Sequence, residues 1–530
     1  MTELSEVPSG EATDSFSRTS PALTISTPCI SSQVEVDPLL SRKGPQEEPS
    51  LELQRSAESG TPEIAIIADV NTDTSAQSAV PEITPPASAP RKVVPLRTNE
   101  NRYPRFSRGF LWEHCDQYTT PLASLSEHLR PIPGPPQNEL NNPVSLRTIT
   151  DNSDLFQVVT PIAVDCFEAL LSSHPNRPLV DSVLRGLREG FWPFAETDHL
   201  EFPDTWDGGS IPLTEEASTF ISQYAEEEEG LQRYSHPFGP DLLPGMYSMP
   251  VHAVPKPHSS KLRFINDHSA GPFSLNAMID KANVGMRPDN VQDLGCNLLR
   301  VRKLHGNIPI WLFKSDVKNV YRLIPMHPLW QLKQVVSVNG LRRIDRCMCF
   351  GSRRSPDIWC SFMSLVVWIA IHIYSIEALQ AYMDDNFAFD LLAHLVLYEP
   401  YHRYMPHQQV MLLRLWDELQ IPHEDSKQVH GHALTIIGFH VDTQNMTITL
   451  LQESCTALVT HIRDFVTNAP RRRHPLRDWQ RLLGWINWGL NVQPLLCPAL
   501  QAAYTKIRGL ATACTSVPQC PSQARSTLGC

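Results

Sequence analysis

Two adjacent carboxylates, Asp384 and Asp385, stand between short apolar runs in the segment 381–390. Adjacent Asp side chains repel each other and are costly to remove from water, so we expect a cation to be held beside them. The flanking residues are long enough for two short strands, which would place the Asp pair at or beside a tight turn. For an Asp pair on its own, a solvated acidic turn is the competing interpretation.

A third carboxylate, Asp316, follows the apolar run 308–313 and precedes another turn. An Asp at the end of one strand, facing an Asp pair on a hairpin, is the arrangement that two divalent ions ~3.5–4 Å apart require. Hard oxygen ligands without nearby His or Cys favour magnesium or manganese over zinc. The sequence therefore predicts two Mg²⁺ or Mn²⁺ ions at Asp316, Asp384 and Asp385.

The elements that must position these residues are short strands and longer helices in alternation. Strands are predicted within 246–257, 260–269, 308–317, 331–340 and 341–350, and a hairpin-like pair within 434–450. Helices are predicted at 355–374, before the Asp pair, and at 406–421, after it. This order predicts an α+β fold in which an antiparallel sheet carries helices on one face.

The first 235 residues differ in composition from the rest. Residues 1–100 are rich in Ser, Thr, Pro and Glu, with Phe16 as their single aromatic, which predicts a disordered region. Residues 101–235 are predicted to be a partly helical N-terminal extension, with helices at 159–173 and 178–192. The acidic stretch at 196–229 lies near the end of this extension and is expected to be a solvated loop or helix face. A regulatory segment that mimics nucleic acid is the alternative.

The net charge of −12 is unevenly distributed. Residues 1–100 carry 15 acids and 7 bases, and residues 191–230 carry 11 acids and no base. Residues 231–530 carry 30 bases and 21 acids, a net charge of +9. The part of the chain that holds the three carboxylates is therefore basic, which is compatible with a nucleic-acid partner.

Cysteine usage and hydropathy indicate an intracellular protein without a membrane partner. The 12 Cys are scattered, and Cys347 and Cys349 lack the usual zinc spacing, so we expect free thiols. The N-terminus has no signal-peptide pattern. The longest apolar run, 362–376, is too short and too interrupted for a membrane span and indicates a buried helix.

Several segments together resemble the ordered motifs of reverse transcriptases. Asp316 is followed five residues later by Tyr321, then by FGSRRSP at 350–356, YMDD at 382–385 and IIGFHVD at 436–442. The resemblance covers about 249–450, with a thumb-like continuation to about 510. The sequence is most similar to retrotransposon enzymes, particularly the DIRS-like group that uses a tyrosine recombinase. The segments 174–194, 254–271 and 482–496 carry this similarity.

The resemblance implies a right-hand architecture of fingers, palm and thumb. Fingers and palm would occupy 236–450, a helical thumb-like region 451–510, and a disordered tail 511–530. Asp316 and Asp384 would be the principal metal ligands, with Asp385 nearby but less directly bound. These three carboxylates would form the catalytic and metal site.

Further roles are implied for the nucleotide site. Tyr321 would lie under the incoming sugar and leave no room for a 2′-hydroxyl; a core Tyr is the alternative. Gly351, Ser355 and Pro356 would form the turn and helix start that hold template and nucleotide, which is compatible with Ser355 being an ordinary N-cap. Phe350 stands where retroviral enzymes have Gln, as it does in many retrotransposon enzymes.

Cationic residues are implied at the phosphates. Lys256, Lys261 and Arg263 resemble the basic residues that grip the triphosphate, with solvated surface cations as the alternative. Lys427 stands where these enzymes can carry a proton donor to pyrophosphate, although a surface Lys is equally compatible. Asp267, four residues after Arg263, also fits the family pattern.

The primer and template would be held from two places. Tyr382 and Met383 would touch the primer end, while a lone Met could also be core filler. In the thumb position, apolar residues recur with a helical period from residue 476, and a group of basic residues stands at the start of that run. These basic residues are Arg471, Arg472, Arg473, Arg477 and Arg481. They would bind template–primer phosphates; a nuclear-targeting cluster or a solvated face are the alternatives.

These residues predict an RNA-directed DNA polymerase of a retrotransposon, acting on an RNA template, a DNA or RNA primer and dNTPs. About twenty polar residues follow Gly509, too few for a ribonuclease H, protease or recombinase domain. We therefore expect a polymerase section that is truncated or separately encoded, with other proteins of the element, such as ribonuclease H and recombinase, as candidate partners. A catalytically silent or domesticated copy that only binds nucleic acid is one alternative. An RNA-dependent RNA polymerase is another, although Tyr321 argues against it because that enzyme must admit a 2′-hydroxyl.

Overall fold

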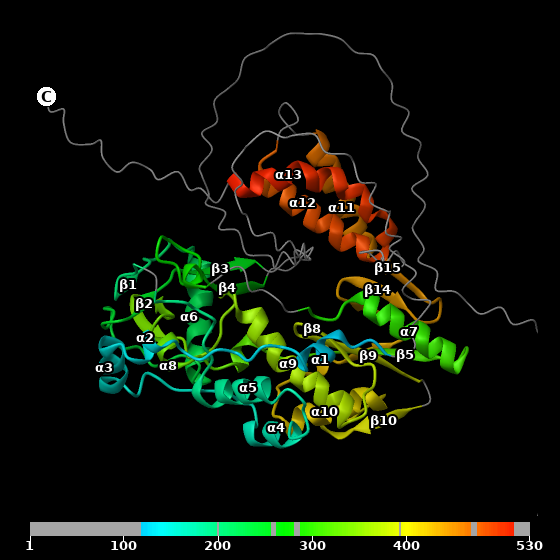
Figure 1. Cartoon of the computed structure of the whole chain (residues 1–530), viewed down its shortest axis with the longest axis horizontal. Coiled ribbons are helices and arrows are strands. Elements are labelled where there is room, and N and C mark those ends of the chain that lie inside the picture. The colour runs from blue at the N-terminus through cyan, green and yellow to red at the C-terminus, as the bar shows by residue number, and fades with distance from the viewer. Residues whose placement is uncertain are drawn as a thin grey trace, which may run out of the picture.

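The structure is a computed structural model that describes residues 118–198, 201–255, 261–279, 287–391, 394–467 and 474–513. The predicted disorder of residues 1–100 lies outside these ranges, as do residues 514–530 of the predicted tail. The described chain mixes helices and sheets (Figure 1). The predicted mixture of helices and strands is therefore found.

A four-stranded sheet, here named the central sheet, carries the predicted carboxylates. Its strands run in the order β12 (Val429–Gly431), β5 (Ile310–Asp316), β9 (Asp385–Leu391) and β8 (Gln380–Tyr382). Every neighbouring pair is antiparallel, as predicted. The hairpin of β8 and β9 also matches the two short strands expected around the Asp pair.

Helices cover both faces of the central sheet, so the prediction of helices on one face is wrong. They are α7 (Val291–His305), α9 (Ser355–His372) and α10 (His407–Glu418). Leu312 and Phe387 pack with α7 on one face, while Phe313 and Ala388 pack with α9 and α10 on the other. Because β5 contains the apolar run 310–313 and β9 the apolar run 387–389, each strand presents apolar side chains on both faces, and both faces require a partner.

The longest of these helices, α9, forms the centre of the main hydrophobic core. Within the described residues it is the one helix long and apolar enough to cross a membrane. However, 83% of its apolar window is buried inside the protein, which fits a core helix. The predicted buried helix is therefore confirmed.

Most of the N-terminal helices pack into this same core, the exception being α2. The N-terminal helices are α1 (Pro121–Ser126), α2 (Gln137–Leu140), α3 (Pro143–Asp151), α4 (Val164–Leu170) and α5 (Arg177–Glu189). Phe167 of α4 contacts Phe362 of α9, with ring centroids 5.3 Å apart. Leu122 of α1 and Leu179 of α5 are fully buried in the cluster that includes α9. Residues 118–195 are therefore an integral part of the central core.

The acidic stretch forms α6 (Glu215–Gly230), which packs against the hairpin of β3 (Val251–Pro255) and β4 (Leu262–Asn266). Figure 1 shows α6 beside this hairpin. The prediction of a solvated helix face is wrong for Glu228, which is 3% exposed and paired with two arginines. The run Glu226 to Glu229 completes a helical turn, so one of its members must face the core.

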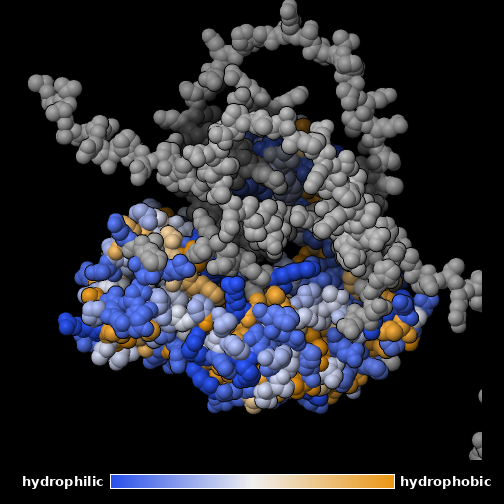
Figure 2. All heavy atoms as spheres, in the orientation of Figure 1, coloured by the Kyte–Doolittle hydropathy of each residue, from blue (hydrophilic) through white to orange (hydrophobic). Residues whose placement is uncertain are grey.

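A second four-stranded sheet lies next to α6, and smaller elements complete the body. Its strands are β1 (Trp206–Asp207), β2 (Tyr247–Ser248), β6 (Val335–Val338) and β7 (Leu341–Ile344). The pairs β1–β2 and β2–β6 are parallel and only β6–β7 is antiparallel, so the predicted antiparallel pairing is wrong for β2 in this sheet. The smaller elements are η2 (Leu275–Met278), η3 (Val320–Leu323), α8 (Pro328–Gln331), β10 (Leu395–Tyr398), η4 (Glu399–Tyr401), β11 (Arg403–Pro406) and η5 (Asp425–Lys427). On the face drawn in Figure 2, hydrophilic and apolar residues are interspersed over this body.

The C-terminal part is a three-stranded sheet followed by helices. The strands are β13 (Ala433–Ile436), β14 (Phe439–Asp442) and β15 (Thr447–Leu450), and the helices are α11 (Gln452–Thr467), α12 (Leu476–Gly489), η7 (Leu490–Val492), η8 (Pro494–Leu500) and α13 (Gln501–Ala513). Trp488 of α12 packs on Phe439, with ring centroids 5.0 Å apart. The helix α13 continues to Ala513, so the tail predicted to begin at 511 starts too early.

Candidate active site

The three predicted carboxylates meet at one end of the central sheet. Asp316 and Asp385 are direct partners across the β5–β9 ladder. Asp384 lies in the turn that precedes β9, and its carbonyl accepts a hydrogen bond from the Val317 amide at 3.2 Å. Partners across an antiparallel pair have Cα atoms only ~4.5–5.5 Å apart. The antiparallel register thus places carboxylates from sequence positions 68 residues or more apart side by side.

The turn between β8 and β9 is held by α9. Met383 has a φ of 54°, a left-handed conformation that is uncommon for a residue with a side chain. The indole nitrogen of Trp359 donates to the Met383 carbonyl at 2.8 Å, and the thiol of Cys360 lies 3.8 Å from the Met383 sulfur. Met383 therefore packs partly against the core, and its predicted contact with the primer stays a prediction.

Two lysines bind the carboxylates. Lys427 Nζ lies 2.7 Å from Asp316 Oδ1, and Lys314 Nζ lies 3.0 Å from Asp385 Oδ1. The sequence predicted Lys427 at this site, and its role as a proton donor stays a prediction. Lys314 was missed, although it stands two residues before Asp316 in a strand and so shares a face with it.

The electrostatics of the site are those of crowded, half-buried acids. Burial, followed by the charges of Asp385 and Asp316, raises the pKa of Asp384 to about 6. Burial also raises the pKa of Asp385, against the opposing charge of Lys314. Burial lowers the pKa of Lys427, but its hydrogen bond to Asp316 and the nearby charges outweigh that and raise it. A cation beside Asp384 would relieve this excess of negative charge.

The side chains around the site differ in their chemistry as metal ligands. Across the described ranges, no group of three or more His, Cys, Asp or Glu side chains is arranged to hold a metal ion. The three Asp nevertheless supply hard oxygen atoms only, and two of them already bind a cationic ammonium group. Cys347 and Cys349 are buried free thiols, and burial raises the pKa of each to about 12, so they are poor metal ligands.

An aromatic and cationic stack lies beside the carboxylates. The ring of Tyr321, on η3, packs on Phe350 with centroids 5.0 Å apart, and the guanidinium of Arg263 lies 5.8 Å from the Phe350 ring. Tyr321 is buried, whereas 42% of Phe350 is exposed. Burial, followed by the neighbouring Cys360 and Asp384, raises the pKa of Tyr321. The structure thus brings predicted nucleotide-site residues from β4 and η3 together through Phe350.

The turn before α9 is tightly packed. A Cβ atom on Gly351 would lie 1.6 Å from the Asn266 carbonyl oxygen, so only glycine fits there. Ser355 is the first residue of α9, and Arg354 is the N-cap, so the expectation that Ser355 is the N-cap is wrong. The Ser355 hydroxyl instead donates to the Cys349 carbonyl at 2.6 Å and is buried. Pro356 takes the second helical position, where a missing N–H is tolerated.

The remaining predicted residues are spread over the surface and beyond the described ranges. Lys261 precedes β4 and is exposed, as is Arg263 on β4. Arg477 and Arg481 are exposed on α12, and Tyr382 lies opposite Asp385 on β8, where burial raises its pKa to about 12. Lys256, Arg471, Arg472 and Arg473 lie outside the described residues.

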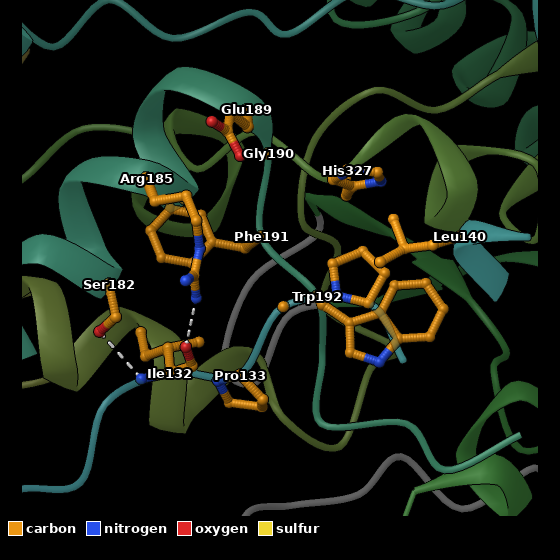
Figure 3. Close-up of a pocket in the computed structure, with 13 residues that line it drawn as sticks. Ile132, Pro133, Leu140, Ser182, Arg185, Glu189, Gly190, Phe191, Trp192 and His327 are labelled. Atoms are coloured by element: carbon orange, nitrogen blue, oxygen red, sulfur yellow. Dashed lines mark hydrogen bonds between the residues drawn. The ribbon is translucent and has the colours of Figure 1, made fainter. Parts of the chain in front are cut away.

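A cavity of about 240 Å³ lies elsewhere in the molecule (Figure 3). It is bounded by Ile132, Pro133 and Trp192 together with residues of α5. Ser182 accepts a hydrogen bond from the Ile132 amide at 2.9 Å, and Arg185 donates to the Ile132 carbonyl at 2.8 Å. None of the predicted site residues lines this cavity, so it is separate from the acidic site.

Comparisons with known proteins yield distant structural matches. No protein-family model and no curated protein matches the sequence. Among solved structures, the chain is similar to a foamy viral protease-reverse transcriptase dRH in complex with double-stranded DNA, with a TM-score of 0.38 and 14% identity over 57% of this chain and 45% of that chain. It is also similar to the foamy viral protease-reverse transcriptase bound to RNA/DNA hybrid, with a TM-score of 0.37 and 14% identity over 57% of this chain and 34% of that one.

A third similar structure is the same viral protein in complex with double-stranded DNA, with a TM-score of 0.37 and 12% identity over 68% of each chain. This chain spans less than half of the length of the first two proteins. At these TM-scores and identities the likeness carries no argument about activity.

Proposed function

We propose that this chain is an RNA-directed DNA polymerase of a retrotransposon, with a fingers, palm and thumb architecture. Within the retrotransposon enzymes, we assign it to the DIRS-like group. The observation that carries the proposal is the register of β5 and β9, which pairs Asp316 with Asp385 and leaves Asp384 in the adjoining turn. The ordered motifs around these residues support the same assignment. The stack of Tyr321, Phe350 and Arg263 beside them offers a place for a nucleotide.

The residues of the chain have distinct roles in this proposal. Asp316, Asp384 and Asp385 would hold two Mg²⁺ or Mn²⁺ ions, which when bound lower the pKa of a hydroxyl and neutralise phosphate charge. Tyr321 and Phe350 shape the floor under the sugar and base, and Arg263 supplies positive charge for the triphosphate. Lys427 keeps its proton at neutral pH because its pKa is raised, which suits a proton donor to pyrophosphate.

The proposed partners are an RNA template, a DNA or RNA primer and dNTPs, inside the cell. Other proteins of the element, such as a ribonuclease H or a recombinase, are further proposed partners. The exposed Arg477 and Arg481 on α12 are available for backbone phosphates. Such contacts predict binding that weakens strongly with salt and is largely independent of sequence.

The test is primer extension by the full chain on an RNA template, with dNTPs and Mg²⁺ or Mn²⁺. The matched variant is Asp384→Asn with Asp385→Asn, which keeps side-chain volume and removes two charges. We expect extension by the wild type and a loss of at least about a hundredfold in the variant, because preorganised charge stabilisation is removed. Template binding, measured in parallel, should be retained by both proteins.

A second candidate is a nucleic-acid-binding protein without catalysis. The observation that favours it is the pairing of Asp316 and Asp385 with lysines, which occupies two of the three carboxylates. The same experiment separates the two functions. Salt-sensitive template binding by the wild type without any extension, with either metal ion, would replace the polymerase with this second function.

A further inference from the structure

A buried ion cluster lies directly behind the proposed nucleotide site. Its centre is Arg322, which is 4% exposed. The guanidinium donates through Nε and Nη2 to Glu228 Oε2, at 2.9 and 2.6 Å, and through Nη1 to both oxygens of Asp345, at 2.9 and 3.0 Å. Arg233 adds a second cation at 3.1 Å from Glu228 Oε1. The cluster thus contains two acids and two bases.

The members of the cluster come from distant parts of the chain. Glu228 lies on α6, in the acidic stretch of the N-terminal region, whereas Asp345 directly follows β7. Arg322 lies on η3, next to Tyr321. Burial raises the pKa of Asp345 to about 6, which reflects how completely the cluster is removed from water. Removing one partner of such a cluster leaves a buried charge unpaired, which is strongly unfavourable.

Arg322 also contacts the segment that carries Phe350. Its Nη1 atom donates to the Met348 carbonyl at 3.2 Å and, more weakly, to the Cys347 carbonyl at 3.4 Å. Two residues further along, Phe350 packs on Tyr321. The Arg322 guanidinium therefore holds the backbone that leads to Phe350, and Arg322 is itself the next residue after Tyr321 in the chain. Both halves of the aromatic pair are fixed to a common point.

The helix α6 supplies Glu228, one of the two anions that hold the Arg322 guanidinium in place. The ring of Tyr224 stacks on Phe264 of β4, with centroids 4.6 Å apart, so α6 also packs against the strand that carries Arg263. All three members of the stack beside the carboxylates are thus connected to α6. A small displacement of a binding residue can change turnover by about a hundredfold, so this support bears on catalysis.

We propose that Glu228 and Arg322 are positioning residues for Tyr321 and Phe350, and that α6 thereby sets the selection of deoxynucleotides over ribonucleotides. This inference rests on the proposed polymerase function. It gives the acidic N-terminal stretch a function in substrate selection. Glu228 and Arg322 are both buried and are bonded to each other, so they would act through Tyr321 and Phe350 rather than by contact with a nucleotide.

The test uses the full chain with Glu228→Gln, which keeps the shape of the side chain and removes its charge. Glu227→Gln is the matched control, since Glu227 is its exposed neighbour on the same helix. Glu228→Asp keeps the charge on a shorter side chain and should give an intermediate result. Two readouts are compared: amide hydrogen exchange of the segments 319–326 and 345–352, and the ratio of kcat/KM for dNTP to that for rNTP.

We expect exchange in the two segments to be at least about tenfold faster in Glu228→Gln and unchanged in Glu227→Gln. The dNTP to rNTP ratio should fall by about tenfold, within the range that one pocket contact contributes to discrimination. Glu228→Asp should lie between the wild type and Glu228→Gln in both readouts. A purely structural role would instead lower both rates in proportion and leave the ratio unchanged.

The two readouts separate failure of this inference from failure of the proposed function. If exchange in the two segments is unaffected by Glu228→Gln, or changes equally in Glu227→Gln, the positioning role is wrong. If exchange accelerates and the ratio stays constant, the selection role is wrong. If the wild type extends no primer with either nucleotide, the polymerase proposal and the selection role fall together, while hydrogen exchange still decides the positioning role.

Discussion

Tyr321 makes the substrate preference of the proposed site testable at the scale of one residue. Its ring is buried against the exposed Phe350 and lies close enough to Asp384 for that charge to affect its pKa. Tyr321→Ala should open space for a 2′-hydroxyl and lower the dNTP to rNTP ratio by about 10–200-fold. Tyr321→Phe is the control, because it keeps the ring and should keep the preference. Equal ratios in the Ala variant and the wild type would contradict the role.

His268 predicts how the stability of the molecule depends on pH. It is fully buried, with its ring 3.3 Å from the Cys349 thiol, and burial lowers its pKa to about 4, against the opposing charge of Asp267. Between pH 6.5 and 4 the unfolded chain binds a proton at this residue that the folded chain does not. Stability is therefore fully present above pH 6.5 and is lost toward pH 4, by about 3 kcal/mol in total.

Chemical denaturation across this pH range checks the sign. His268→Asn should be less stable at pH 7 but should lose stability less steeply on acidification, by up to ~1.4 kcal/mol per pH unit. His305→Asn is the control, because His305 is exposed at the end of α7 and its replacement should leave the slope unchanged. An unaltered slope in His268→Asn would show that burial does not lower the pKa of this histidine in the folded protein.

At the scale of elements, a glycine in a packed turn and a glycine within a helix should respond oppositely to an added methyl group. Gly351 lies where a Cβ would overlap the Asn266 carbonyl at 1.6 Å, so Gly351→Ala must separate the turn before α9 from β4. Gly484 lies within α12 with no atom within 4 Å of its Cβ position. We expect Gly351→Ala to destabilise the chain by about 3 kcal/mol and Gly484→Ala to stabilise it by about 0.5–1 kcal/mol, as measured by denaturant unfolding. Similar changes in both variants would contradict this packing.

The elements also show which parts of the site a sequence can predict. The convergence of Asp316 with Asp384 and Asp385 was predictable because each lies beside a short apolar run that can only form a strand. Ser355 was assigned to the wrong helical position, because its choice of partner depends on where the Cys349 carbonyl lies in three dimensions. Glu228 was expected in solvent, since a run of four Glu carries no signal for which one meets a buried arginine.

The packing on the faces of the central sheet was also predictable only in part. The alternation of strands and helices predicted the antiparallel order, which depends mostly on local pattern. The covering of the second face depends on α7, which lies just before β5 in the sequence and packs on Leu312 of β5 and Phe387 of β9. The short apolar runs 310–313 in β5 and 387–389 in β9 were the available signal, because a strand with one solvated face alternates apolar and polar residues.

At the scale of the whole molecule, the N-terminal helices and the proposed catalytic part form one folding unit. The cluster around α9 includes buried side chains from α1, α4 and α5, such as Leu122, Phe167 and Leu179. Trp368 of α9 is also covered by His174, whose ring centroid lies 4.6 Å away. The boundary at about 235 that the sequence composition suggests therefore does not separate two cores.

A chain that begins at residue 231 tests this unity. It would expose the face of α9 that these helices cover and would leave Arg322 without Glu228, so we expect it to lose cooperative thermal unfolding and to bind an apolar dye. A chain that begins at residue 101 is the control, since composition predicts that residues 1–100 contribute no core. This control should melt cooperatively, close to the full-length protein. A 231–530 chain that melts at the same temperature as the control would contradict the shared core.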